Sequence, residues 1–465
     1  MHMLHYTIYY AYKGNFYPLA ALKNLRYKGL RGYGRIGYGR FITYPREVKL
    51  IADRRHLHAH PEEGWCEFET TWFIVQRLKA LGLEWKAGID VIEPSAVMGR
   101  NADLVEKAKK RALEHGVPAD FLGHLGGYTG AMAVLNTGRP GPVTGIRVDI
   151  DCLPIEESND PAHEANAGNY RSVYPGFSHA CGHDGHTAVG LAAARWLSEN
   201  REKLCGTVKI LFQPAEEGVR GAAAMAAKGI VDDVNWFAGA HIGCSARLGQ
   251  VGVSHFGYLA TTKFDLRYHG LAAAAGSPEK GRSALMCGAA TCMSLGSLPG
   301  HSQGITRVQI GRFESGTGRN IIAENAFMQL EVRGESTEIN DYMAANVEMT
   351  VKGLAAAYGV DYELTRMGEA VTYRGDEEAV SIVKEVAAQV PGVDSVVDMN
   401  AKIGSEDCTM LIRRVQEHGG KAVFFYYGCN HPGHHRGDFC IQDETSLPIG
   451  FGCFVGFIQR INGVK

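Results

Sequence analysis

One nine-residue segment constrains this chain more than any other. The segment Ser178-His-Ala-Cys-Gly-His-Asp-Gly-His186 contains a thiol, three imidazoles and a carboxylate. Its two glycines let the backbone turn tightly, so that several of these side chains can converge on one point. Cysteine and histidine together suit zinc, manganese, cobalt or nickel, and a metal-bound thiol is deprotonated. A single histidine is usually structural, but this density at the start of a predicted helix indicates a metal-binding loop.

The composition of the chain is that of an ordinary globular protein. Of its 465 residues, 45% are hydrophobic and 21% are charged, which excludes general disorder and allows two or three domains. No run of about 18 apolar residues predicts a membrane-spanning segment. A net charge of −2 argues against nucleic acid as the main partner. Eleven cysteines, an odd number, in a chain without a predicted secretory signal favour free thiols in a reducing cytoplasm.

Residues 1–46 differ from the rest of the chain. They contain nine tyrosines and eight lysines or arginines but no acidic residue. The glycine spacing and the missing periodicity predict a disordered extension, and the lack of an unbroken apolar core argues against a secretory signal. Two interpretations stay open. The segment is either a basic, aromatic arm that contacts RNA or an acidic partner, or a dispensable extension that includes a wrongly chosen start codon.

From residue 47 onward, helical and strand patterns alternate, which predicts a three-layer α/β domain with a mostly parallel sheet. Helices are expected at 47–57, 70–81, 186–200, 222–228 and 377–390, and strands at 130–135, 145–150, 207–212, 236–241 and 422–428. The carboxyl ends of parallel strands usually line the functional site. We therefore expect the chemistry in the loops that follow Ile150, Phe212 and Ala240.

The pattern changes between about residues 257 and 367. There the expected order is strand, helix, strand, strand, helix, strand, which is typical of a ferredoxin-like α+β unit. Because α/β patterning resumes afterwards, this unit is predicted to be inserted into the first domain. The expected domains are thus a catalytic domain made of 47–256 and 368–465, and an inserted domain of 257–367.

Two adjacent carboxylates follow a predicted buried strand in Gln213-Pro-Ala-Glu-Glu-Gly218. In isolation, a solvated turn explains Glu216 and Glu217 equally well. Beside a metal-binding loop the other interpretation gains weight, because one carboxylate can bind a metal while its neighbour acts as a general base.

Further donors follow other predicted strands. His241 ends one strand, and His434 and His435 lie near the C-terminus. Each alone would more often be a core or surface histidine. Together with the loop and the carboxylate pair, they supply enough nitrogen, sulfur and oxygen donors for two metals about 3.5–4 Å apart with a bridging ligand. Asp149 and Asp151 alternate at a strand end and, like Asp184, suit hydrogen bonding to metal-bound imidazoles, with capping of the following turn as the alternative.

Several motifs together resemble one known family. Asp53-Arg-Arg-His-Leu-His-Ala-His-Pro-Glu62, the Cys-Gly-His-Asp-Gly-His loop, Pro-Ala-Glu-Glu-Gly and the late histidine are similar to the M20 metallopeptidase and amidohydrolase family. Within it, the chain resembles the amidohydrolase branch that uses a cysteine ligand. The resemblance covers about residues 47–460 and implies a zinc-peptidase-like catalytic domain with an inserted lid and dimerisation domain.

The resemblance also implies roles for individual residues. The implied ligands of a dinuclear site are Cys181 as the bridge, His183, Glu217, His241 and His435. His435 is preferred because the family's late histidine lies four residues before a phenylalanine, here Phe439, although a longer spacing after Phe439 keeps His434 as an alternative. Glu216 is implied as the base that takes a proton from metal-bound water and returns it to the leaving amine. Arg319 and Asn320 match positions that bind the substrate's carboxylate or amide.

One departure from the family affects the expected activity. The family's lid motif appears here as Gly270-Leu-Ala-Ala-Ala-Ala-Gly276, so that Ala274 replaces a histidine thought to stabilise the oxyanion. Losing one such donor typically costs about 10²–10³ in rate. The main hypothesis is an amide hydrolase with two divalent cations, Mn or Zn, acting on an N-acyl amino acid such as p-aminobenzoyl-glutamate. The alternatives are a silent or weakened metal-binding protein that pairs with a homologous partner, and an M20 hydrolase of another acyl amino acid or small peptide. A homodimer or heterodimer through the lid is expected.

Overall fold

The computed structural model describes residues 9–12, 15–18, 45–400 and 404–464. Most of the predicted extension, residues 1–46, therefore lies outside the described residues. Within it, strand β1 (Tyr9–Tyr12) pairs in antiparallel fashion with β2 (Asn15–Pro18). None of the described helices is both long and apolar enough to span a membrane.

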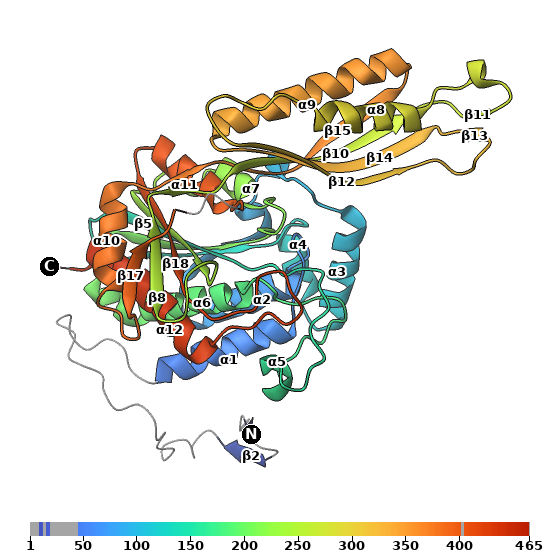
Figure 1. The fold of residues 1–465 in the computed structure, drawn as a ribbon. Coiled ribbons are helices and arrows are strands. Elements are labelled where there is room, and N and C mark those ends of the chain that lie inside the picture. The colour runs from blue at the N-terminus through green and yellow to red at the C-terminus, as the bar shows by residue number, and fades with distance from the viewer. Residues whose placement is uncertain (1–8, 13–14, 19–44, 401–403, 465) are drawn as a thin grey trace. The chain divides into compact units, whose positions relative to one another are not determined.

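An eight-stranded sheet forms the centre of the large domain (Figure 1). Its strands in spatial order are β17 (Ser395–Asp398), β8 (Gln250–Ser254), β18 (Lys421–Tyr427), β7 (Trp236–Ile242), β5 (Val143–Asp149), β6 (Thr207–Gln213), β4 (Ala131–Asn136) and β3 (Glu84–Ala87). The central strands β18, β7, β5 and β6 are parallel, as predicted. The sheet as a whole is mixed, because β4 pairs antiparallel with β6 and β3, and β8 pairs antiparallel with β18.

Helices cover both faces of this sheet, which confirms the three-layer α/β class. On one face lie α1 (Pro45–Ala59), α6 (His183–Asn200) and α12 (Asp443–Asn462), and on the other α7 (Ala222–Ala227) and α11 (Cys408–Glu417) (Figure 1). The remaining helices are α2 (Phe68–Ala80), α3 (Ala102–Glu114), α4 (Ala119–His124), α5 (Glu164–Ala167) and α10 (Glu377–Ala387). Helix α6 is buried along most of its length, because small residues such as Gly190 allow the β5 and β6 side chains to approach closely.

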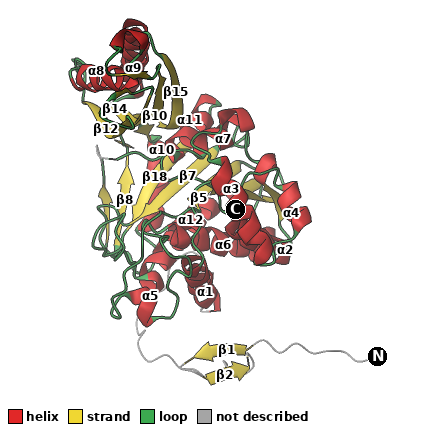
Figure 2. Ribbon diagram, turned by 90° about the vertical axis from the view of Figure 1, so that its right-hand side faces the viewer, coloured by secondary structure: helices red, strands yellow, loops and turns green. Residues whose placement is uncertain are grey.

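A second, smaller sheet has the antiparallel order β12-β14-β10-β15 (Figure 2). Its elements along the chain are β10 (Ala260–His269), α8 (Ala284–Gly296), β12 (Thr306–Ser315), β14 (Asn325–Gly334), α9 (Thr337–Tyr358) and β15 (Asp361–Ala370). This is the predicted strand and helix order of a ferredoxin-like unit. Its buried apolar residues form a cluster separate from that of the large sheet. We call these six elements the small subdomain.

Two short strand pairs were not predicted. β9 (Phe256–Gly257) pairs with β16 (Tyr373–Arg374) where the chain passes between the large sheet and the small subdomain. β11 (Ala273–Ala274) pairs with β13 (Ile321–Ile322) in the small subdomain. Figure 1 shows β11 and β13 at the end of the small subdomain that points away from the large sheet.

Candidate metal centre

The carboxyl ends of β5, β6 and β7 bring the predicted site residues together, as expected for neighbouring parallel strands. Asp149 and Asp151 follow β5, Glu216 and Glu217 follow β6, and His241 lies near the end of β7. The N-terminus of α6 faces the same edge. Gly182 has a φ of 88°, a left-handed conformation that suits glycine, and it turns the chain between Cys181 and His183.

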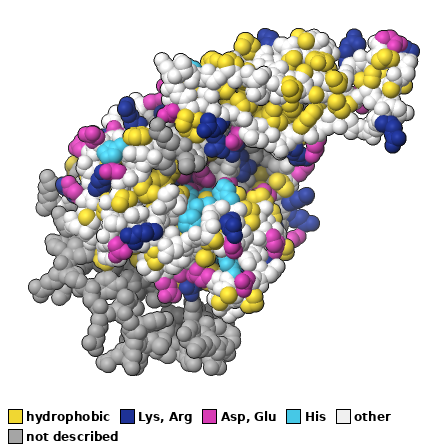
Figure 3. Space-filling model, viewed as in Figure 1, with side chains coloured by type: hydrophobic (Ala, Val, Ile, Leu, Met, Phe, Trp, Pro, Cys, Tyr) yellow, Lys and Arg dark blue, Asp and Glu magenta, His cyan; other side chains and the backbone are white. Residues whose placement is uncertain are grey.

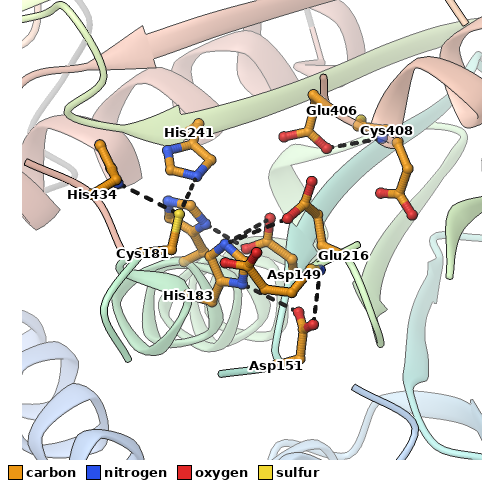
Figure 4. Close-up of polar contacts among 12 residues, drawn as sticks. Asp149, Asp151, Cys181, His183, Glu216, His241, Glu406, Cys408 and His434 are labelled. Carbon is orange, nitrogen blue, oxygen red and sulfur yellow. Dashed lines mark hydrogen bonds and ion pairs between the residues drawn. The ribbon is translucent and has the colours of Figure 1, made fainter. Parts of the chain in front are cut away.

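Cys181 lies at the centre of the cluster (Figure 4). Its sulfur is 3.4 Å from Nε2 of His241 and 3.5 Å from Nδ1 of His434, and these three ligand atoms lie within 4.8 Å of one another. A second group within the same limit joins Cys181 to Glu217 and His435. Because both groups share the thiol, its position suits a ligand that bridges two cations.

His241 and His183 both present a free nitrogen to this cluster. The Nδ1–H group of His241 donates to the carbonyl of Ile242 at 2.8 Å, which leaves the Nε2 lone pair facing Cys181. Nδ1 of His183 donates to Asp151 at 3.2 Å. A hydrogen bond at one ring nitrogen fixes the tautomer that a metal requires at the other. Both imidazoles are therefore oriented as ligands.

His186 also lies within 4.8 Å of His183 and His241, but both of its nitrogens are engaged. Its Nδ1–H donates to Asp149, and its Nε2 accepts the N–H of Ile242 at 2.8 Å. The remaining histidine of the loop, His179, is also buried. His186 thus acts as a structural link between α6, β5 and β7.

Two of the three predicted supporting aspartates contact histidines of the cluster. One oxygen of Asp151 binds His183, and the other accepts the main-chain N–H of Glu217 at 2.9 Å. Asp149 holds His186 and pairs with the buried guanidinium of Arg147 at 2.8 Å. Asp184 instead points away, toward Arg54 at 2.9 Å and His58 at 2.8 Å. It anchors the start of α6 to α1.

A second pair of carboxylates stands opposite Glu216. Glu406 and Asp407 have oxygens within 4.8 Å of Glu216, and all three residues are buried (Figure 4). Burial raises the pKa of the Glu216 carboxyl well above its usual range, and the Glu406 carboxylate raises it further. Arg147 lies 3.0 Å from Glu406 and 3.3 Å from Asp407. Neither carboxylate was among the predicted site residues, and their only signal in the sequence is the Gly404-Ser-Glu-Asp407 motif.

The two late histidines occupy different places. Nε2 of His434 accepts the main-chain N–H of Cys244 at 3.0 Å, so the proton of its neutral ring lies on Nδ1, facing the sulfur of Cys181. Nε2 of His435 lies 3.5 Å from Glu217, and its side chain is 54% exposed. Figure 3 shows histidine side chains gathered beside acidic ones in a hollow of this face.

The donor set fits divalent cations. Among the described residues, no hydrogen-bond partner reaches two buried atoms of the cluster, Nε2 of His183 and Oε1 of Glu217. Buried polar atoms are almost always paired in folded proteins, and an unpaired one calls for an explanation such as an ion. Here the two unpaired atoms are an imidazole nitrogen and a carboxylate oxygen beside a thiol, which is a donor set for zinc or manganese.

The predicted substrate-binding residues lie elsewhere in this chain. Arg319 and Asn320 are exposed in the small subdomain, just before β13. Ala274 is exposed in β11 and pairs with Ile321, while the carbonyl of Asn320 accepts the N–H of Ala275 at 2.9 Å. The three positions therefore form one surface, but the structure does not join that surface to the Cys181 cluster.

The sheet, the inserted subdomain and the cluster at the strand ends define a metal-dependent hydrolase. Residues 145–460 match the model of the peptidase family M20/M25/M40. The chain belongs to this family, as its motifs predicted.

Relatives support the same placement. The chain is 41% identical to a p-aminobenzoyl-glutamate hydrolase homolog of Haemophilus influenzae, over 89% of this chain and 98% of the relative. It is also 41% identical to the indole-3-acetyl-aspartic acid hydrolase of Enterobacter agglomerans, over 85% and 92% of the two chains. A crystal structure of an aminobenzoyl-glutamate utilization protein from Klebsiella pneumoniae matches with a TM-score of 0.76 at 37% identity, covering 88% of this chain and 95% of that one.

Proposed function

We propose that this M20 hydrolase cleaves the amide bond of an N-acyl amino acid whose amino-acid part is acidic, with p-aminobenzoyl-glutamate as the main candidate. Two similar relatives support this substrate class, because their names specify an aromatic or indolic acyl group joined to glutamate or aspartate. The observation that carries the proposal is the cluster of Cys181, His183, Glu217 and His241 with a second carboxylate, Glu216, beside it.

In this proposal the cluster holds two divalent cations, Mn or Zn. Cys181 bridges them, and His183, Glu217 and His241 complete the set together with His435, with His434 as the alternative late ligand. Bound cations of this kind polarise a substrate carbonyl and lower the pKa of water. The protein's own contribution is to fix the ligands. Asp151 orients His183 and the Glu217 main chain, and Ile242 orients His241.

Glu216 is the proposed general base. Its carboxylate lies within 4.8 Å of His183 and Glu217, so a water molecule at the cluster is within its reach. The high pKa that burial gives Glu216 favours its accepting a proton from water and then donating that proton to the leaving amine. Nearby cations lower the pKa of a carboxyl, which brings this group toward neutral pH.

We further propose that a second, homologous protein completes the site through the small subdomain, residues 257–367, which acts as a lid. Arg319 and Asn320 would bind the substrate carboxylate there, and Ala274 cannot supply the oxyanion donor. The relative from Haemophilus influenzae is named for one of the subunits of a hydrolase, which supports pairing with a partner that carries such a donor.

The surface that suits this partner lies on α8 and the neighbouring β12. Leu285, Met286 and Met293 of α8 and Phe313 of β12 are exposed apolar residues, and Figure 3 shows hydrophobic side chains gathered over the small subdomain. β12 is also an edge strand with unpaired main-chain groups. Large exposed apolar patches mark protein interfaces. All eleven cysteines are unpaired, which supports the proposed reducing cytoplasmic location.

Release of free glutamate from p-aminobenzoyl-glutamate tests the substrate proposal. The chain is incubated with Mn²⁺ or Zn²⁺, alone and with a homologous partner protein that has the lid histidine, and indole-3-acetyl-aspartate and N-acetyl-glutamate are assayed in parallel. We expect glutamate release that requires the metal. If none of these compounds is hydrolysed in either arrangement, the proposed substrate class is wrong.

A further inference from the structure

The loop that carries Glu216 and Glu217 has an unfavourable backbone. Ala215, Gly218 and Val219 have φ angles of 52°, 86° and 59°. Left-handed backbone is uncommon outside glycine and especially unfavourable for a β-branched residue such as valine. Such conformations persist only where the surroundings hold them in place. The contacts of this loop therefore determine where the two glutamates point.

The large domain holds one side of the loop. Three buried carboxylates accept its main-chain N–H groups: Glu67 from Ala215 at 2.8 Å, Asp151 from Glu217 at 2.9 Å, and Asp407 from Gly221 and Ala222 at 3.0 and 2.9 Å. These bonds fix the two ends of the loop and one ligand. They leave the left-handed turn at Gly218 and Val219 to be held from elsewhere.

The small subdomain holds that turn. The main-chain N–H of Glu369, near the end of β15, donates to the carbonyl of Val219 at 2.8 Å. Beside it, the backbone of Gly368 packs so closely that an added Cβ would lie 2.1 Å from the Gly218 oxygen and 3.0 Å from the Val219 oxygen. β15 is an edge strand of its sheet, so its free edge is available to the loop.

A β-bulge aims the strand at the loop. Lys263 of β10 pairs with Gly368, but the next residue, Phe264, pairs with Arg366, so that Met367 is the extra residue. A bulge bends its strand and redirects the following residues. The bulge therefore places Gly368 and Glu369 against the turn rather than in line with the rest of β15.

We propose that Gly368 and the main chain of Glu369 are positioning residues, through which the small subdomain sets the orientation of the base Glu216 and the ligand Glu217. This inference rests on the proposed function for the roles of the two glutamates. A shift of β15 moves the Val219 carbonyl, two residues from Glu217. Misplacement of a catalytic group by about 1 Å can cost about 10²-fold in rate. The position of the lid is thus transmitted to the metal centre by main-chain contact.

Two variants remove this contact in different ways. Gly368→Ala inserts a methyl group against two backbone oxygens, which cannot move as a flexible side chain would. Glu369→Pro removes only the N–H donor, since proline is tolerated on an edge strand where its nitrogen faces away from the sheet. The matched controls are Gly353→Ala, where an added Cβ meets nothing within 4 Å, and Glu369→Ala, which keeps the donor.

The readouts are the affinity for Mn²⁺ or Zn²⁺, measured without substrate by competition with a chromophoric chelator, and kcat and KM of the loaded enzyme. Circular dichroism and thermal unfolding check the fold. We expect both variants to bind metal about 10–100-fold more weakly or to lose a similar factor in kcat with little change in KM, while both controls match the wild type.

Two results would overturn the inference. One is a folded Glu369→Pro or Gly368→Ala protein whose metal affinity and kcat both stay within about twofold of the wild type. The other is loss of folding in both variants while both controls fold, which would show a structural role only. Because metal affinity is measured without substrate, it tests the inference even if p-aminobenzoyl-glutamate is not hydrolysed.

Discussion

The carboxylate of Asp151 accepts the Nδ1 proton of His183 through one oxygen and the main-chain N–H of Glu217 through the other, at 3.2 and 2.9 Å. One buried side chain therefore orients two candidate ligands that come from different segments of the chain. Such supporting contacts are typically worth 10–100-fold in metal affinity.

We expect Asp151→Ala to weaken binding of Mn²⁺ or Zn²⁺ by about 10–100-fold while the protein stays folded. The measurement is a chelator-competition titration, with the exposed Asp103→Ala as the control. An unchanged dissociation constant in Asp151→Ala would show that the orientation of His183 and Glu217 does not depend on this carboxylate.

The two adjacent glutamates are expected to fail in different ways. Glu216→Gln removes the base and keeps a neutral side chain of the same size, so kcat should fall by about 10²–10⁴ with the metal content retained. Glu217→Gln removes a ligand, so the metal content itself should fall. Metal analysis and glutamate release on the same preparations separate the two roles. Equal metal loss in both variants would contradict the assignment.

The fold and most of the site could be predicted from the chain, because local patterns and strand ends determined them. The alternation of strands and helices placed β5, β6 and β7 side by side, and that order alone brings Asp151, Glu217 and His241 to one edge. The antiparallel partners β3 and β8 were not predicted, since short half-exposed strands carry little periodic signal. The pairing of Glu406 with Arg147, far earlier in the chain, depends on packing that no spacing reveals.

The late histidines provide a sharper test. If His435 is the ligand, His435→Ala should lower the metal content and His434→Ala should leave it nearly unchanged. The hydrogen bond from the Cys244 N–H to Nε2 of His434 supports this expectation, because it leaves a proton on the nitrogen that faces Cys181. Metal loss in His434→Ala alone would reverse the assignment.

Ala274 is expected to limit activity in the absence of a partner. Restoring the donor by Ala274→His should raise kcat of the isolated chain by about 10²–10³, the usual contribution of one oxyanion donor. Ala272→His, two residues earlier and also exposed, is the matched control. If Ala274→His changes nothing while the wild type is already active, the donor comes from another residue.

The link between Glu157 and His58 predicts a dependence of stability on pH. Burial opposes ionisation of Glu157, but the hydrogen bond from His58 at 2.8 Å outweighs it and lowers the pKa of Glu157 to about 2. A lowered pKa stabilises the fold above the unfolded value of about 4.3, and this stabilisation is lost as the pH falls toward 2.

Glu157→Gln should therefore lower the free energy of unfolding on the order of 3 kcal/mol at pH 7, and this difference from the wild type should shrink below about pH 4. Urea unfolding at several pH values measures it. A difference that stays constant from pH 7 to pH 3 would show that ionisation of Glu157 makes no contribution.

The number of divalent cations bound per chain tests the central claim most directly. We predict that inductively coupled plasma mass spectrometry of the metal-loaded protein gives two cations per chain. Because Cys181 belongs to both groups of ligands, folded Cys181→Ala should retain fewer than one. Two cations retained by Cys181→Ala would contradict the shared thiolate and with it the proposed dinuclear centre.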